Sequence, residues 1–99
     1  MLEVKKEIND KVMDLYIVGS VETTTAPILE KEVKESINDV DEVVLHLDEL
    51  EYISSAGLRV LLMAKKGLGS RGEVVVKNAN DSIMEIFEVT GFISVFRIE

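Results

Sequence analysis

The chain of 99 residues lacks cysteine and tryptophan and has a single histidine, His46. Without cysteine it can form neither a disulfide nor a thiolate metal site, and a zinc site built on one imidazole would need unusual ligands. No apolar run approaches the ~20 residues of a membrane span, and the N-terminus lacks the apolar core of a signal peptide. Basic residues are few, 11 against 19 acidic ones, giving a formal net charge of -8 that disfavours phosphate backbones and anionic membranes. These absences predict a cytoplasmic protein that binds no nucleic acid, membrane or cofactor.

The composition that remains is typical of a globular domain. It is 46% hydrophobic and 30% charged, and the length suits one domain, residues 1–99, with a modest core. Apolar and charged residues alternate from Leu2 to Ile8, and a turn signal at Asn9-Asp10-Lys11 leads to a second strand from Val12 to Val18. The two strands are therefore expected to form a hairpin, which Gly19-Ser20 ends.

Three later segments have helical periodicity, and three short apolar runs predict strands between and after them. The first helix follows the candidate N-caps Thr23, Thr24 and Thr25, carries Pro27 in its first turn and ends near Asn38-Asp39. The second spans Ala56 to Lys66, with Gly67 as its C-cap, and the third runs from Asn80-Asp81-Ser82 to Gly91, with Ser82 and Glu85 as a capping box. The expected strands are Val43 to Leu47, Glu73 to Lys77 and an edge strand from Phe92 to Ile98.

The order of these elements is β-β-α-β-α-β-α-β. Strands that alternate with helices form parallel pairs through right-handed crossovers, and the hairpin adds one antiparallel strand. The predicted fold class is therefore α/β, a single small mixed sheet with helices packed on it. In such sheets the loops after the carboxyl ends of the strands tend to carry function.

One such loop contains paired serines. An acidic stretch, Asp48 to Glu51, expected to be a solvated loop, leads into Ser54-Ser55 at the start of the second helix. The simplest interpretation is that one serine is an N-cap; the other is that one is modified, since a helix N-terminus tolerates a phosphate. Hydrolase chemistry is weakly supported because Ile53 breaks the G-x-S-x-G pattern and His46 lies in the preceding strand. We therefore expect no enzymatic activity.

The residues around the serines resemble the central signature of STAS domains, specifically of bacterial anti-sigma factor antagonists. The element Gly19-Ser20-Val21-Glu22 is similar to the family's Gly-x-hydrophobic-Asp element, and Thr90-Gly91-Phe92 to the turn after its third helix. The resemblance covers about Lys5 to Ile98. Its central segment reads Asp48-x-x-x-Tyr52-Ile53-Ser54-Ser55-Ala56-Gly57-Leu58-x-Val60-Leu61-Leu62.

The resemblance implies a switch between proteins. An unphosphorylated antagonist of this family captures an anti-sigma factor, often itself a Ser/Thr kinase, and so frees a sigma factor for transcription. Phosphorylation of one serine ends the capture, and a metal-dependent, PP2C-type phosphatase resets it. Motif matching assigns that serine to Ser55, with Ser54, where the family often has Asp, as the alternative. The other hypotheses are a STAS scaffold or ligand-sensing module without phosphorylation, and a small hydrolase acting through Ser55 or Glu22.

The partner is expected to contact one edge of the sheet, formed by the two loops if their strands are neighbours. The acidic residues of that edge imply a partner with basic groups. Gly57, in the first helical turn, suggests a close approach to the backbone by the 23–25 loop or by the partner; the alternative is that a glycine is simply tolerated near a helix end. The residues predicted to contact the partner are Glu22, Thr23, Thr24, Ser54, Ser55, Ala56, Gly57, Leu58 and Arg59.

Overall fold

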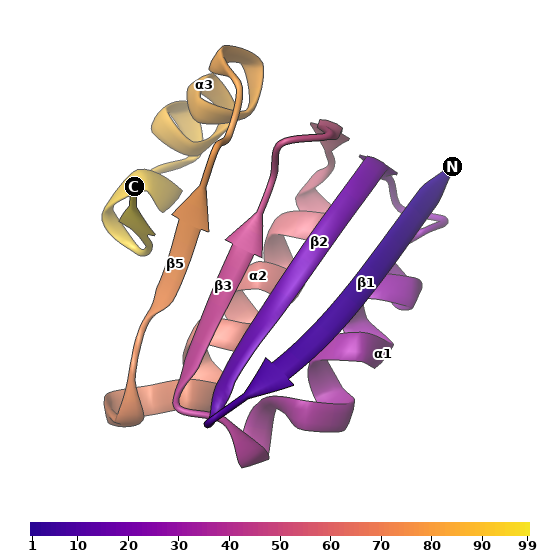
Figure 1. The fold of residues 1–99 in the computed structure, drawn as a ribbon. Helices are drawn as coiled ribbons and strands as arrows, with labels where there is room; N and C mark the ends of the chain where they lie inside the picture. The colour runs from indigo at the N-terminus through magenta and orange to yellow at the C-terminus, as the bar shows by residue number, and fades with distance from the viewer.

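A computed structural model describes residues 1–99 and contains one mixed sheet with three α-helices, which confirms the predicted fold class (Figure 1). The strand order is β1-β2-β3-β5-β6, and β4 pairs with the end of β2. The strands are β1 (Leu2–Asn9), β2 (Val12–Val21), β3 (Glu42–His46), β4 (Leu50–Ile53), β5 (Val74–Lys77) and β6 (Arg97–Ile98). The helices are α1 (Ala26–Ser36), α2 (Ser55–Leu68) and α3 (Asp81–Thr90), with 3₁₀ turns at Ile37–Asp39, Gly69–Arg71 and Phe92–Ser94.

The hairpin of β1 and β2 is the antiparallel part of the sheet, as expected. Its turn residues Asp10 and Lys11 have φ of 49° and 69°, the left-handed conformation that a type I′ hairpin turn requires at both central residues. All other strand pairs are parallel. Along the chain, the strands after β2 are connected through the helices, except that a short connection joins β3 to β4. Figure 1 shows α1 and α2 side by side behind the sheet.

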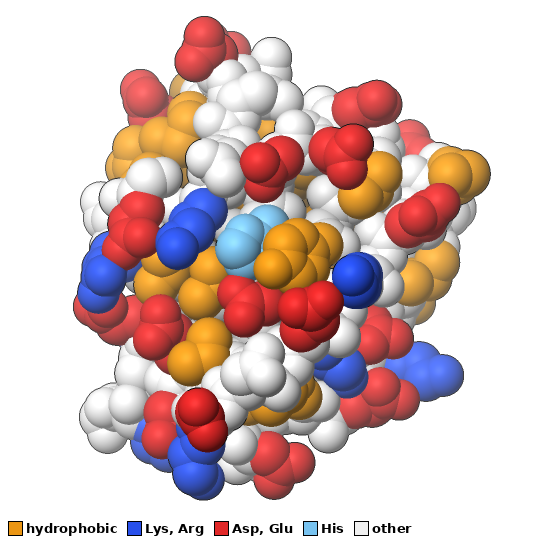
Figure 2. Space-filling view, viewed as in Figure 1, with side chains coloured by type: hydrophobic (Ala, Val, Ile, Leu, Met, Phe, Trp, Pro, Cys, Tyr) orange, Lys and Arg blue, Asp and Glu red, His pale blue; other side chains and the backbone are white.

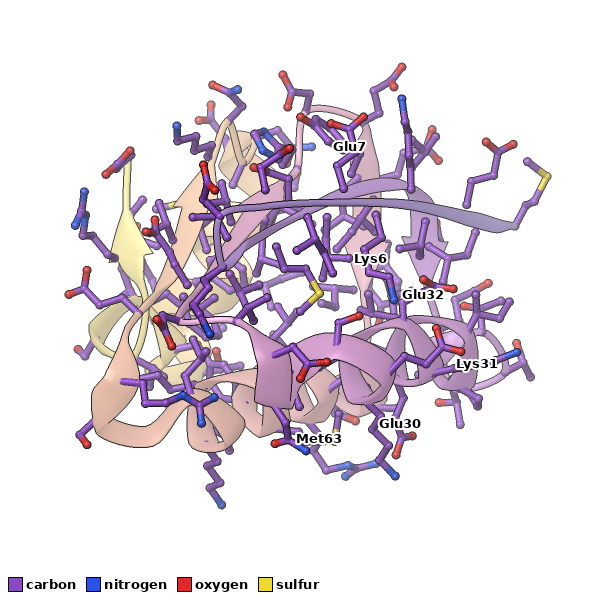
Figure 3. All side chains as sticks on the ribbon, turned by 60° about the horizontal axis from the view of Figure 1, so that its bottom comes forward. Lys6, Glu7, Glu30, Lys31, Glu32 and Met63 are labelled. Atoms are coloured by element: carbon purple, nitrogen blue, oxygen red, sulfur yellow. The ribbon has the colours of Figure 1, made fainter.

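The core lies between the sheet and the helices. Met13, Leu15 and Ile17 of β2 alternate with outward residues and are at most 1% exposed. They join residues of all three helices in one cluster of 25 buried side chains. Lys6 of β1 lies on this side of the sheet but stays at its rim, where its Nζ lies 3.3 Å from carboxylate oxygens of Glu32 and Glu35 on α1 (Figure 3). An inward charge on an edge strand also disfavours pairing with a second sheet.

Two strand boundaries differ from the sequence-based expectations. Gly19-Ser20 does not end β2, because Gly19 takes φ of +100° at a shift in register and the strand continues to Val21. The acidic stretch is not only a loop, because Leu50–Ile53 forms β4 beside the continuation of β2. Both differences come from one pairing, in which the extended end of β2 supplies a partner to β4.

The other differences concern the helix ends and the last residues of the chain. Helix α2 passes through Gly67 and ends at Gly69, which has φ of +58°. The side chain of Asn80, not the Ser82–Glu85 pair, caps α3 by accepting a hydrogen bond from Ile83 N. The segment from Phe92 to Ile98 begins with a 3₁₀ turn at Phe92–Ser94, and only Arg97–Ile98 pairs with β5, because Phe92 and Phe96 turn inward to pack on each other. Gly91 ends α3 as predicted, with φ of +80°.

No helix of this fold is both long enough and apolar enough to cross a lipid bilayer.

Candidate functional site

The carboxyl ends of β2 and β4 lie side by side. Val21 and Ile53, the last residues of the two strands, are register partners. One residue further on, the Ser54 N–H donates a hydrogen bond to the Val21 carbonyl at 2.7 Å. The turn that follows β2 and the serines that follow β4 therefore meet at one edge of the sheet, the condition on which the predicted contact surface depended.

The two serines have different structural environments. Ser54 is the N-cap of α2: its backbone is extended, its Oγ accepts a hydrogen bond from Gly57 N at 3.3 Å, and its carbonyl accepts one from Leu58 N at 2.9 Å. Ser55 is the first residue of the helix, and its exposed hydroxyl has no hydrogen-bond partner within the chain. The N-cap interpretation therefore applies to Ser54 and leaves the Ser55 hydroxyl free for chemistry.

The neighbouring turn, residues 22–25, is held by Thr25. Thr25 Oγ1 accepts a hydrogen bond from Glu22 N at 2.8 Å and lies 3.1 Å from the Ser20 carbonyl, to which it donates. Its hydroxyl thus closes the turn and makes no cap bond to α1, although Thr25 occupies the N-cap position. This role had no signal in the sequence beyond the run of three threonines. The turn presents Glu22, Thr23 and Thr24 to solvent.

The edge is acidic. Glu22, Asp48, Glu49 and Glu51 are all exposed. Figure 2 shows acidic side chains, and no basic ones, over the end of the molecule where β2 finishes. Because α1 and α2 both start at this edge, the positive ends of their dipoles offset part of this negative charge. The arrangement suits a partner that carries basic groups.

Gly57 and Leu58 do not belong to the exposed surface. A Cβ placed on Gly57 would lie 2.6 Å from Ile53 Cγ1 and 2.7 Å from Val21 Cγ1, so the group that approaches this backbone is the domain's own core. The interpretation that the 23–25 loop or a partner approaches Gly57 is therefore wrong. Leu58 is 6% exposed and packs in the core. Of the remaining predicted contact residues, Glu22, Thr23, Thr24, Ser55 and Arg59 are exposed, and Ser54 and Ala56 are partly exposed.

His46 lies away from the serines. Its Nε2 is 2.7 Å from Asp14 Oδ1, and its ring stacks on Tyr16 with centroids 4.2 Å apart. Figure 2 shows the imidazole on the face of the sheet that looks away from α1 and α2, in the middle of that view. It is the only imidazole of the chain, so the Ser55 hydroxyl has no histidine base beside it. No three side chains of the kinds that bind metals are grouped to hold an ion.

Two residues of the edge were not expected from the sequence. Asn80 bridges α3 and β4, since its Nδ2 donates to the Leu50 carbonyl at 3.0 Å while its Oδ1 accepts from Ile83 N. Tyr52 of β4 is 48% exposed and pairs in register with Ser20. Both follow from β4, whose only sequence signal is the apolar pair Leu50 and Ile53 on either side of Glu51-Tyr52.

The comparison with protein families gives one match over almost the whole chain. A family model described as the STAS domain matches residues 3–99. BtrV of Bordetella bronchiseptica, a protein assigned as an anti-sigma factor antagonist, is 38% identical over 94 residues, which cover 90% of this chain and 81% of BtrV.

Solved structures share the fold. A crystal structure of an anti-sigma factor antagonist from Mycobacterium paratuberculosis superposes with a TM-score of 0.89 at 23% identity, covering 99% of this chain and 85% of that one. The Bacillus cell fate determinant SpoIIAA in its phosphorylated form gives a TM-score of 0.75 at 12% identity, covering 100% of this chain and 91% of SpoIIAA. At these identities the likeness concerns the fold alone.

Proposed function

This chain belongs to the STAS domain family, and we propose that it is an anti-sigma factor antagonist whose capture of an anti-sigma factor is switched off by phosphorylation of Ser55. The family resemblance predicted from the sequence is confirmed by the match over residues 3–99 and by the 38% identity to BtrV. The family is one of regulators rather than enzymes. A cytoplasmic location, where sigma factors act, is part of the proposal.

The observation that carries the choice of Ser55 is the different bonding of the two serines. Ser54 Oγ accepts the Gly57 N–H, so modification of Ser54 would disturb the cap of α2. Ser55 is exposed at the first position of the helix, with its hydroxyl unbonded and within reach of a kinase. The existence of SpoIIAA in a phosphorylated form, with the same fold, supports a phosphorylation switch on this scaffold.

The proposed modification transfers the γ-phosphoryl group of ATP to Ser55 Oγ and releases ADP and the hydroxyl proton. It adds about -1.5 to -2 charge at a helix N-terminus, where unpaired N–H groups and the dipole favour an anion. The folded domain therefore accommodates phosphoserine at position 55 without refolding. The cost falls on the complex, where the phosphate would be buried against the partner; a loss of ~3 kcal/mol weakens binding more than a hundredfold.

The proposed partners follow from the family and from the charge of the edge. The anti-sigma factor, which we propose is also the Ser/Thr kinase, would contact the 22–25 turn together with Ser55 and Arg59. Basic groups on this partner would complement the exposed carboxylates. A PP2C-type phosphatase would remove the phosphate and return the antagonist to its binding state.

Two alternatives are distinguishable from this proposal. A STAS scaffold or ligand-sensing module that binds without phosphorylation has the same fold. Only a test for phosphorylation of Ser55 therefore distinguishes it from the proposed switch. A small hydrolase is disfavoured by geometry, since His46 is engaged with Asp14 on the other side of the sheet and Glu22 stands in an exposed turn without a paired acid or base.

The experiment is incubation of the intact chain with ATP and its cognate kinase, followed by intact-mass measurement and phosphopeptide mapping. We expect one phosphate, located on Ser55, absent from the Ser55→Ala variant and retained by the matched Ser54→Ala variant. Phosphate on Ser54 or on Thr23 to Thr25 would refute the assignment. No phosphate with a kinase that still binds the chain would favour the scaffold alternative.

A further inference from the structure

Arg59 is an arginine without an intramolecular partner in a chain rich in carboxylates. The chain has three arginines. Arg71 donates to the carbonyls of Ile37, Val40 and Gly67, and Arg97 pairs with Glu73 and Glu99. Arg59 makes no hydrogen bond or ion pair, although the net charge is -8 and its side chain is exposed. An unpaired guanidinium in such a chain is available to bind an anion.

The helical neighbours of Arg59 explain why it is unpaired. The positions three and four residues away on α2, which are the ones close enough to interact, are Ala56, Ser55, Leu62 and Met63. None carries a charge. A single modification would change this, because a phosphate on Ser55 would place about -1.5 to -2 charge at the position four residues before Arg59.

The spacing suits an intrahelical ion pair. Side chains at i and i+4 have Cβ atoms about 5–6 Å apart, and the pair is more favourable with the anion on the N-terminal side, as it would be here. Both residues are exposed, so neither rotamer is restricted by the core. The planar guanidinium also matches two oxygens of a phosphate at once.

We propose that Arg59 is the residue that binds the phosphate of the Ser55-phosphorylated protein, a role that rests on the proposed function. In the unphosphorylated protein the same guanidinium remains free to pair with a carboxylate of the partner. Phosphorylation therefore acts twice: it adds negative charge at the interface and withdraws a positive donor from it.

The test measures the phosphate directly. Protein carrying phosphoserine at position 55, installed by chemical ligation so that no kinase is needed, is titrated by ³¹P NMR alongside its Arg59→Gln and Lys66→Gln variants. Lys66 is exposed near the other end of α2 and forms no ion pair, so its variant loses the same charge far from Ser55. Glu22 and Glu51 are present in all three proteins, so their effect on the phosphate cancels.

The second pKa of the phosphate, ordinarily about 6, is expected to be about 0.3 higher in the Arg59→Gln variant than in the parent. That change is a twofold loss of preference for the dianion, the size that an exposed i,i+4 ion pair produces. The Lys66→Gln variant should match the parent, and 1 M salt should remove the difference. In an Arg59→Lys variant, which keeps the charge and loses the planar fork, the pKa should lie between those of the parent and Arg59→Gln.

Equal phosphate pKa values in the parent and in Arg59→Gln would overturn the role of Arg59, as would equal shifts in the Arg59→Gln and Lys66→Gln variants. Either result would leave phosphorylation of Ser55 standing. Failure of the cognate kinase to modify Ser55 would instead refute the proposed function without affecting the titration, so the two failures are distinguishable. Thermal melts of the unphosphorylated variants, expected to match the parent because both side chains are exposed, verify that each variant is folded.

Discussion

Replacing Gly57 with alanine adds one methyl group where α2 meets the ends of β2 and β4. The new Cβ would lie 2.6 Å from Ile53 Cγ1 and 2.7 Å from Val21 Cγ1, whereas ordinary carbon contacts are about 3.5–4.0 Å. Val21 and Ile53 are 0% and 2% exposed and are paired with each other in the sheet. Because both side chains are buried in the core, either they or α2 itself would have to shift.

Two opposing contributions set the size of the effect. Alanine is favoured over glycine in a helix by up to ~1 kcal/mol, which would stabilise the variant. Overpacking a buried site costs about 1–3 kcal/mol, and two close contacts on rigid strands place Gly57 in the upper half of that range. We therefore expect Gly57→Ala to lower the free energy of unfolding by about 1–2 kcal/mol, equivalent to several degrees in Tm for a domain of this size.

The assay is equilibrium unfolding in urea followed by far-UV circular dichroism, since the chain has no tryptophan to report by fluorescence. A double-mutant cycle identifies the cause, because Val21→Ala removes one of the two atoms that clash with the new Cβ. The cost of Gly57→Ala should be at least ~0.5 kcal/mol smaller in that background. A Gly57→Ala variant that is more stable than the parent, or strictly additive costs in the cycle, would refute the packing argument.

Two further predictions concern the serines and the acidic edge. Ser54→Ala should cost about 1 kcal/mol of unfolding free energy through loss of the N-cap, whereas Ser55→Ala should stay within about 0.5 kcal/mol and Ser55→Asp within about 1 kcal/mol, all by the same melts. Equal losses for Ser54→Ala and Ser55→Ala would contradict the assignment of the cap. Glu22→Lys should slow association with the anti-sigma factor and weaken its salt dependence in stopped-flow measurements. Asp39→Lys, beyond the other end of α1, should not, and similar effects of both reversals would argue against the proposed edge.

Local sequence patterns predicted most of the elements correctly. The alternation from Leu2 to Ile8, the turn signal at Asn9-Asp10-Lys11 and the helical periodicity of the three later segments each correspond to an observed element. These signals are local, because a turn conformation or a buried helix face requires particular residues at fixed short spacings. Chain order then gave the fold class, since alternating strands and helices have few ways to form a sheet.

Features that depend on distant contacts were missed. Strand β4 exists because β2 continues through a register shift at Gly19, and the short segment Leu50–Ile53 has no pattern strong enough to predict it alone. The C-terminal segment alternates like a strand, yet Phe92 and Phe96 pack inward and leave a two-residue strand. In each case tertiary packing outweighed the local preference.

The features of the candidate site likewise fall into those that follow from local sequence and those that depend on tertiary packing. The sequence by itself determined that a serine pair starts an apolar helix after an acidic stretch, that the charge is strongly negative, and which family the motif resembles. Only the tertiary structure decided which serine is the cap and which is free, and that Gly57 faces core side chains rather than a partner. The same holds for the 22–25 turn, which lies beside Ser55 because β2 and β4 end together. The physical reason is that residue type and spacing fix local conformation, whereas exposure and neighbours across the sheet depend on how segments distant in the chain pack.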